Sequence, residues 1–126
     1  MPISYQVDED HLRLTLTFSG VVRPQQFDEN VMALYRRRPE LFAYDCVTDL
    51  RSYEGDLTND DLRPLVELYS NLMPASSAPS RSYLVTDDPS FALWGEALDL
   101  LFPGRVHEVV HSLTEAHARL DQGGVL

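Results

Sequence analysis

Short strand-like runs alternate with amphipathic helical stretches from Tyr44 onward, and this alternation constrains the fold more than any other feature. Residues 44–50, 81–86 and 105–111 are short runs rich in apolar and β-branched side chains, which predicts strands. A helical apolar pattern follows each run, so the strands are joined by crossovers and pair largely in parallel. The sequence therefore predicts an α/β sheet covered by helices.

Two strands and a helix precede this alternation. Apolar residues recur at every second position of residues 3–7 and 12–18, with an acidic turn between them, which predicts a β-hairpin. Pro24 suits the first turn of a helix whose apolar face holds Phe27, Val31, Leu34 and Tyr35. The expected order is β-β-α-β-α-β-α-β-α in a mixed sheet. We expect a single domain over residues 1–126, with its core at about 3–121 and a short C-terminal tail at 122–126.

The start of the helix predicted around residues 62–73 is ambiguous. Thr58 and Asp61 resemble a capping box, but a helix beginning there would place Pro64 deep enough to lose an internal hydrogen bond. Either the regular helix begins near Asp60 or Asp61, or its first turn is kinked. The next residues, 74–80, have the composition of a loop.

The charge balance argues against two classes of partner. The chain has 10 Lys and Arg against 20 Asp and Glu, a net charge of -10. A nucleic-acid-binding protein needs a positive surface, and acidity also opposes anionic membranes. The one basic cluster, residues 36–38, falls where a helix is expected to end, where cations are favourable. We therefore expect no nucleic-acid partner.

The single cysteine, Cys46, excludes an intramolecular disulfide and lies in a predicted strand, where a buried structural thiol is expected. No stretch approaches the ~20 apolar residues of a membrane helix, and the first residues lack the basic and apolar segments of a secretion signal. We expect a cytoplasmic protein without stable membrane insertion.

The segment His107-Glu108-Val109-Val110-His111 matches the H-E-x-x-H pattern of zinc proteases. That chemistry requires a helix, where residues four apart share one face and one metal ion. Here the segment is β-branched and follows a Pro-Gly pair, so we expect a strand that separates the two imidazoles by ~13 Å. The match is interpreted as accidental, with both histidines on one face of an edge strand and exposed to solvent.

Other catalytic patterns are missing from the sequence. It contains no G-x-S-x-G elbow, and its isolated glycines form no phosphate-binding loop. An acidic cluster surrounds the predicted strand end after residue 50. We interpret it as a solvated loop with helix-capping acids rather than a cation site. The sequence thus predicts no catalytic residues, no metal site and no cofactor.

The most distinctive segment, residues 47–58, is predicted as a strand that ends in an acidic loop before a helix. In α/β sheets, ligands and partners usually dock at such a place. Residues 48–55 resemble the D-hydrophobic-R-x-aromatic-E-G stretch of the SpoIIAA-like (STAS/SEC14-like) family. With the element order, this resemblance covers residues 5–120 and implies the STAS-like fold of anti-sigma-factor antagonists.

The same resemblance bears on regulation. In the antagonists, a strand ending in D-L-S leads to a D-S-S-G-L motif whose serine is phosphorylated. Here Asp49 and Leu50 match the strand end and Leu62 the closing leucine, while residues 58–61 read T-N-D-D. The switch serine falls on Asn59 or Asp60, so the phospho-switch is not expected. Ser52 and Thr58 are nearby hydroxyls outside the family position.

The resemblance implies a non-enzymatic regulatory or protein-interaction domain whose partner the sequence does not identify. The expected partner-binding or switch-equivalent surface comprises Asp49, Ser52, Glu54, Thr58, Asn59 and Asp60. The alternative is a SEC14-like pocket for a small apolar ligand or lipid beneath the helix of residues 91–102. The residues expected to line it are Phe91, Trp94, Leu98 and Phe102. An exposed last strand would also permit a homodimer.

Overall fold

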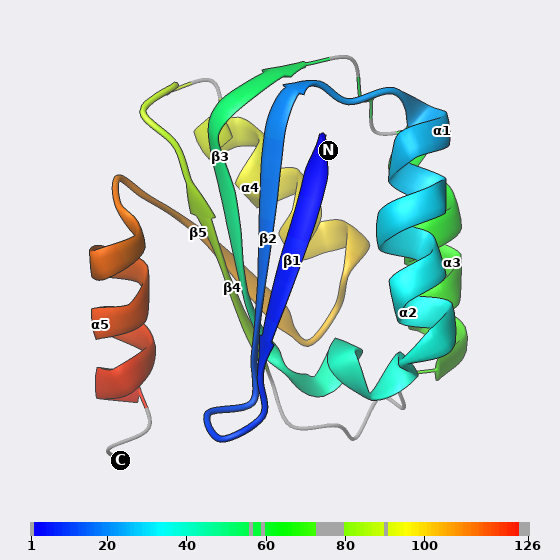
Figure 1. Cartoon of the computed structure of the whole chain (residues 1–126). Coiled ribbons are helices and arrows are strands. Elements are labelled where there is room, and N and C mark those ends of the chain that lie inside the picture. Colours follow the sequence, from blue (N-terminus) through cyan, green and yellow to red (C-terminus); the bar gives the residue numbers. More distant parts are fainter. Residues whose placement is uncertain (1, 56, 59, 73–79, 90, 124–126) are drawn as a thin grey trace.

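Five strands form one mixed sheet in the computed structural model, which describes residues 2–55, 57–58, 60–72, 80–89 and 91–123. The strands lie in the order β1-β2-β3-β4-β5 (Figure 1). Strand β1 pairs antiparallel with β2, and the remaining neighbours pair in parallel. The predicted hairpin and parallel alternation are therefore confirmed. The strand bounds are β1 Ile3–Asp8, β2 Arg13–Val21, β3 Asp45–Gly55, β4 Ser80–Val85 and β5 Arg105–Val110.

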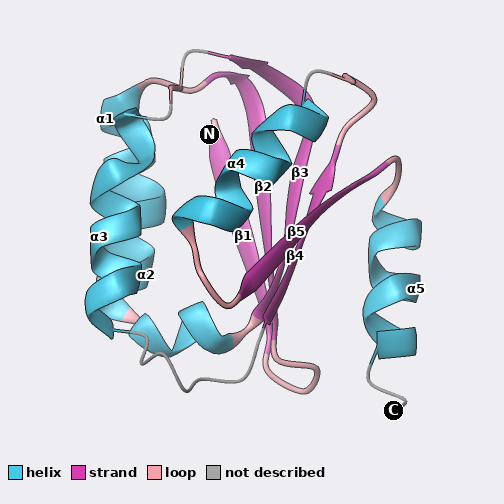
Figure 2. Ribbon diagram, turned by 180° about the vertical axis from the view of Figure 1, so that it is seen from behind, coloured by secondary structure: helices cyan, strands magenta, loops and turns pink. Residues whose placement is uncertain are grey.

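Helices cover both faces of this sheet (Figures 1 and 2). One face carries the first helical region, α3 and α4, and the opposite face carries α5. The first helical region contains a π-helical turn, η1, between α1 and α2. The bounds are α1 Pro24–Phe27, η1 Asp28–Met32, α2 Ala33–Arg37, α3 Arg63–Leu72, α4 Phe91–Leu101 and α5 Leu113–Gly123, with 3-10 turns η2 at Pro39–Ala43 and η3 at Asp60–Leu62.

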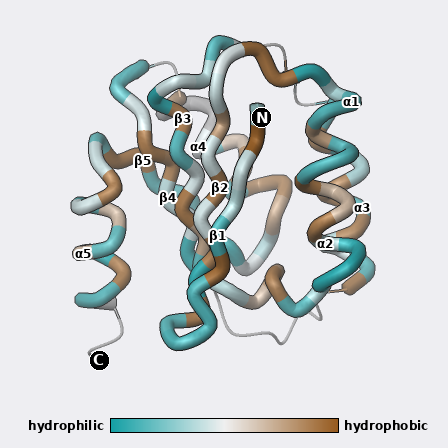
Figure 3. The backbone as a smooth tube through the Cα atoms, in the orientation of Figure 1, coloured by the Kyte–Doolittle hydropathy of each residue, from teal (hydrophilic) through white to brown (hydrophobic). Residues whose placement is uncertain are grey.

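The sheet separates two hydrophobic cores because side chains alternate between its faces. On β3, Cys46 and Leu50 belong to the large core under α1–α4, whereas Val47 belongs to the smaller core under α5. Figure 3 shows hydrophobic residues along the central strands, and hydrophilic residues alternating with hydrophobic ones on α5. The position of β4 between the two cores explains why every residue of this strand is buried except Arg81, including Ser80 and Ser82.

Strand β3 is longer than predicted. The sequence predicts a strand over 44–50 followed by a loop, but β3 continues to Gly55. It continues because β2 also extends, pairing Ser19 with Ser52 and Val21 with Gly55. Backbone pairing thus overrides the polar composition that predicted a loop. Gly55 then turns the chain with a φ of 106°, a conformation that favours glycine.

The start of α3 resolves the ambiguity around Pro64. The backbone N–H of Thr58 donates to Oδ2 of Asp61 at 2.8 Å, which is one half of the capping box. The 3-10 turn η3 follows, and α3 begins at Arg63. Pro64 is therefore the second residue of the regular helix, where its missing N–H costs no internal bond. At the C-terminus, α5 reaches Gly123, so Gln122 and Gly123 of the predicted tail are helical, and residues 124–126 lie outside the described residues.

Candidate functional site

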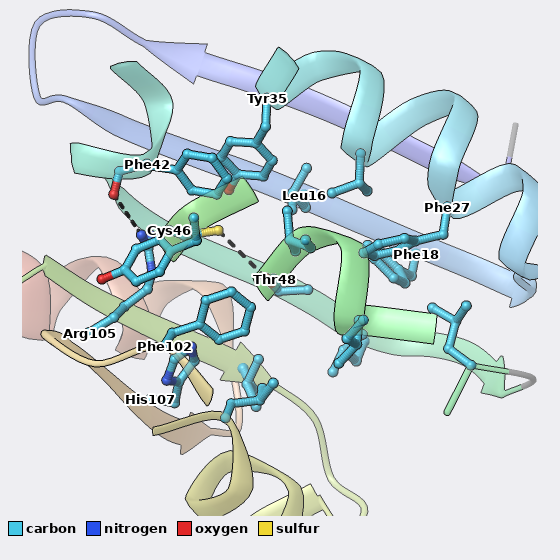
Figure 4. A pocket seen from close by; sticks show the side chains of 18 residues that line it. Leu16, Phe18, Phe27, Tyr35, Phe42, Cys46, Thr48, Phe102, Arg105 and His107 are labelled. Carbon is cyan, nitrogen blue, oxygen red and sulfur yellow. Dashed lines mark hydrogen bonds between the residues drawn. The ribbon is translucent and has the colours of Figure 1, made fainter. Parts of the chain in front are cut away.

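A cavity of about 100 Å³ lies between the sheet and the helices of its larger face (Figure 4). Every strand from β2 to β5 contributes to its wall, as do α1, η1, α2, η2, η3, α3 and α4. The wall is predominantly apolar and aromatic, which is typical of small-molecule sites. The described residues that line it are Leu16, Phe18, Phe27, Val31, Tyr35, Phe42, Cys46, Thr48, Leu50, Leu57, Leu62, Leu65, Tyr69, Leu84, Leu98, Phe102, Arg105 and His107.

One end of the cavity is apolar. It lies toward the carboxyl ends of β2 and β3, where Phe18 and Leu50 point into it. The rings of Phe18 and Phe27 meet edge-on, with centroids 6.5 Å apart. Figure 4 places both rings together, away from the polar side chains. Leu57 and Leu62 also line the wall, so the chain between β3 and α3 lies against the cavity.

The other end of the cavity is polar, and Arg105 is its only formal charge among the described lining residues. Arg105 is the first residue of β5 and is 7% exposed. Its guanidinium donates to the carbonyl of Phe42 at 2.8 Å and to that of Tyr44 at 2.9 Å. Both carbonyls belong to the chain between α2 and β3, so Arg105 joins the start of β5 to this connection.

Neutral polar groups surround Arg105. Tyr35 stacks on Phe42 with ring centroids 4.1 Å apart, and burial raises the pKa of its hydroxyl. Burial likewise raises the pKa of the Cys46 thiol, which lies 3.6 Å from Oγ1 of Thr48. Both groups are uncharged at neutral pH and keep their protons for hydrogen bonding. The buried structural thiol predicted at Cys46 is confirmed.

His107 corrects one prediction about the H-E-x-x-H segment. The strand is confirmed, but the imidazole of His107 is not exposed: its side chain is 5% accessible and lines the cavity. The reason is that α4 covers β5. Gly95 of α4 lies against this strand, and a Cβ built there would make an ordinary contact of 4.0 Å with the His107 carbonyl oxygen.

The two histidines of the segment have separate surroundings. Nδ1 of His107 lies 2.9 Å from Oδ1 of Asp99, and burial lowers the pKa of His107. His111 is exposed and faces Asp87 at 3.5 Å. Within the described ranges, no group of three or more His, Cys, Asp or Glu residues is placed to hold a metal ion.

The residues predicted to line an apolar pocket fall in different places. Leu98 and Phe102 are in the cavity wall. Phe91 lies beside the ring of Tyr53, with centroids 6.3 Å apart. The side chain of Trp94 lies outside the described part of the structure. The cavity extends from α4 across the sheet to α1 and α3, beyond the helix to which the sequence assigned it.

The predicted partner surface combines one buried residue with several exposed ones. Asp49 is 8% exposed and lies within β3 rather than at its end, on the α5 side. Its carboxylate accepts two hydrogen bonds of 2.9 Å from the Arg51 guanidinium. The Arg51 hydrogen bonds hold the pKa of Asp49 below its usual value. Asp49 is therefore an ionised carboxylate whose charge is balanced by Arg51, and its role is structural.

The remaining residues of that surface are more accessible. Ser52 and Glu54 are exposed on the extended part of β3, and Thr58 is exposed before η3. Asp60 pairs with Arg63 at 2.9 Å, with both side chains largely in solvent. Asn59 lies outside the described residues.

Sequence reasoning did not identify Arg105 or Tyr35 as cavity residues. A signal existed for Arg105: it alternates with His107 and Val109 on one face of β5, and a charged residue at the start of a strand on a covered face is unusual. The sequence places Tyr35 on the apolar face of its helix, and nothing local indicates that it faces a cavity rather than solid core.

No protein-family model matches the chain, and no curated protein matches it. The structure is similar to that of an uncharacterised protein of the DUF3478 family with a SpoIIAA-like fold from Shewanella loihica PV-4. The TM-score is 0.65 at 10% sequence identity, and the match covers 94% of this chain and 91% of that chain. The chain therefore has a SpoIIAA-like, α/β fold, as the sequence resemblance implied. Among the described residues, no helix combines the length and apolarity needed to cross a membrane.

Proposed function

We propose that this chain is a non-enzymatic, STAS-like binding domain whose cavity takes a small apolar ligand or one end of a larger one. The observation that carries the proposal is the cavity of about 100 Å³, with its apolar end at Phe18 and Phe27 and its polar end at Arg105. Filling such a volume with apolar groups contributes about 2 kcal/mol of binding free energy, by analogy with the cost of cavities in protein cores. The polar groups at one end then fix the ligand's orientation.

Direct binding of a small apolar probe tests this function. We expect 1-hexanol, titrated into the protein and followed by backbone amide chemical shifts, to perturb cavity-lining residues selectively. A Leu98→Phe substitution fills part of the cavity and should weaken this binding severalfold. Leu113→Phe is the matched control, because Leu113 packs in the core under α5. Unchanged spectra on titration would overturn the proposal.

A second function concerns the extended part of β3. The last β3–β4 pair is Asp49 with Val85, yet β3 continues to Gly55 with Arg51, Ser52 and Glu54 exposed. A strand that projects past its neighbour with polar side chains supports a protein-interaction surface. In this hypothesis Asp60, an acid near the family's switch position, holds the domain in one binding state.

Affinity capture from cell lysate tests the interaction surface. The Ser52→Arg, Glu54→Arg double variant should lose the proteins that the wild type retains, and Glu67→Arg, at an exposed position of α3, should keep them. Asp60→Ser should change the retained set if the acid fixes the binding state. Recovery of identical partners with Asp60→Ser would remove that role from Asp60.

A further inference from the structure

The buried guanidinium of Arg105 has no carboxylate partner among the residues that the structure describes. Ion pairs within 4.0 Å engage Arg13, Arg36, Arg38, Arg51, Arg63 and Arg119, and Arg105 is not one of this group. The described part of the cavity wall also contains no Asp or Glu, although the chain carries 20 of them. A buried cation is strongly unfavourable unless an anion or several dipoles compensate it. Two backbone carbonyls provide part of this compensation.

Arg105 also retains hydrogen-bonding capacity. A guanidinium has five N–H donors in a planar fork. Two of its nitrogens donate to the carbonyls of Phe42 and Tyr44, and these are its hydrogen bonds within the described structure. Because Arg105 lines the cavity, its remaining donors are placed to meet a ligand there. A carboxylate is the ligand group whose geometry and charge match such a fork.

The neighbouring side chains reinforce this polarity. The Tyr35 hydroxyl and the Cys46 thiol are proton donors in the same part of the wall, as Figure 4 shows. Both lie close enough to Arg105 to interact electrostatically with its positive charge. The carboxylate of Asp99 is directed to His107 instead. Polar donors thus gather at one end of the cavity, and the rings of Phe18 and Phe27 lie at the other.

We infer that the ligand is a small apolar acid whose carboxylate binds Arg105 and whose hydrocarbon part extends toward Phe18 and Leu50. This inference rests on the proposed ligand-binding function and adds the chemical class of the ligand. The volume sets the size: a cavity of about 100 Å³ holds a short chain rather than a complete lipid. A longer acid would project from it.

Arg105 also holds the connection between α2 and β3, and a purely structural role must be distinguished from ligand binding. Arg81 offers the comparison. It lies on β4 and donates to the carbonyls of Arg119 and Leu120 at 3.1 and 3.0 Å, on the α5 side. Arg81 therefore makes the same kind of structural contact as Arg105 but does not line the described cavity.

The experiment compares three probes that differ only in their polar group: hexanoate, 1-hexanol and hexylammonium. Each is titrated at neutral pH and moderate salt, and the dissociation constant is obtained from amide chemical shifts. For the wild type we expect hexanoate to bind at least about tenfold tighter than 1-hexanol, with hexylammonium weakest. Arg105→Met should bring hexanoate to the affinity of 1-hexanol or below, Arg105→Lys should retain part of the preference, and Arg81→Met should retain all of it.

The outcomes separate the inference from the function on which it rests. If 1-hexanol binds and hexanoate binds no tighter, the acidic-ligand inference is overturned while the ligand-binding function stands. If none of the three probes binds, the function fails and the inference with it. If Arg105→Met does not fold, the comparison of probes on the wild-type protein still decides the question. A preference for hexanoate that survives in folded Arg105→Met also overturns the inference.

Discussion

The guanidinium of Arg51 donates two hydrogen bonds of 2.9 Å to the carboxylate of Asp49, which lies two positions earlier on the same strand. Asp49 pairs with Val85, which packs in the core under α5, so its side chain lies on the α5 side of β3, opposite the cavity. The backbone N–H of Arg51 adds a third bond at 3.2 Å. Asp49 is 8% exposed, so this local pairing is what allows a carboxylate to be buried at the point where β3 passes the end of β4.

Asp49→Asn should destabilise the protein at neutral pH by about 1–2 kcal/mol, because it removes a charged acceptor while keeping the shape of the side chain. The pKa of Asp49 is lower in the folded protein than in the unfolded chain. Its contribution is therefore present above the unfolded pKa of about 4 and is lost as pH falls through the folded value. Urea unfolding at pH 7 and at successively lower pH should show the two proteins converging below pH ~4.

A matched control comes from Asp60, whose ion pair with Arg63 is exposed. Asp60→Asn should change the free energy of unfolding by less than about 0.5 kcal/mol. An equal loss in Asp49→Asn and Asp60→Asn would show that burial of the Asp49 carboxylate does not determine its contribution.

His107→Gln should flatten the dependence of stability on pH between about 7 and 5. Burial lowers the pKa of His107 below its ordinary value of 6.5, so the folded protein keeps this imidazole neutral while the unfolded chain takes up a proton. The contribution is present above pH ~6.5 and is lost as pH falls from there through the folded value. Urea midpoints across this range measure the slope. The same substitution at His111, whose side chain is 75% exposed, is the control and should leave the wild-type slope unchanged.

Hydrophobic periodicity was sufficient to predict the order of helices and strands, because each of these elements has its own apolar pattern. The alternation of Leu14, Leu16 and Phe18 predicted a half-buried β2, and all three are buried. Periodicity failed to predict the length of β3, because pairing between strands rather than local composition determines where that strand ends. The polar residues after Leu50 carry no strand pattern, yet β2 pairs with them up to Gly55. A register between distant strands is not visible in either strand alone.

The site was less predictable for a related reason. A cavity is the space left between elements, and its wall joins residues as distant in sequence as Leu16 and His107. Helical spacing correctly indicated that Leu98 and Phe102 are buried, but the same spacing describes a solid core. His107 was expected in solvent because β5 lies at an edge of the sheet. The packing of α4 against β5 is what covers it.

Tyr69→Phe should destabilise the protein by about 1 kcal/mol. The hydroxyl of Tyr69 donates to the carbonyl of Pro103 at 2.7 Å and so joins α3 to the turn after α4. The ring itself would stay in place, edge-on to Phe42 and Phe102 at 5.5 and 5.2 Å. Urea unfolding measures the loss. Tyr5→Phe is the control, since Tyr5 is 47% exposed and accepts a 3.2 Å bond from Arg37, and it should have an effect below about 0.5 kcal/mol.

Cys46 should react with iodoacetamide about a hundredfold or more slowly in the folded protein than in urea. It is the only thiol in the chain and is 4% exposed, and burial raises its pKa, so reaction requires the protein to open. Mass spectrometry of the alkylated protein over time gives the rate.

Because Cys46 also lines the cavity, saturating 1-hexanol or hexanoate should slow native-state alkylation further. Alkylation in urea should be unaffected by either probe, which separates protection by binding from a direct effect on the reagent. Rapid alkylation of the native protein would show that the cavity wall at Cys46 is open to solvent.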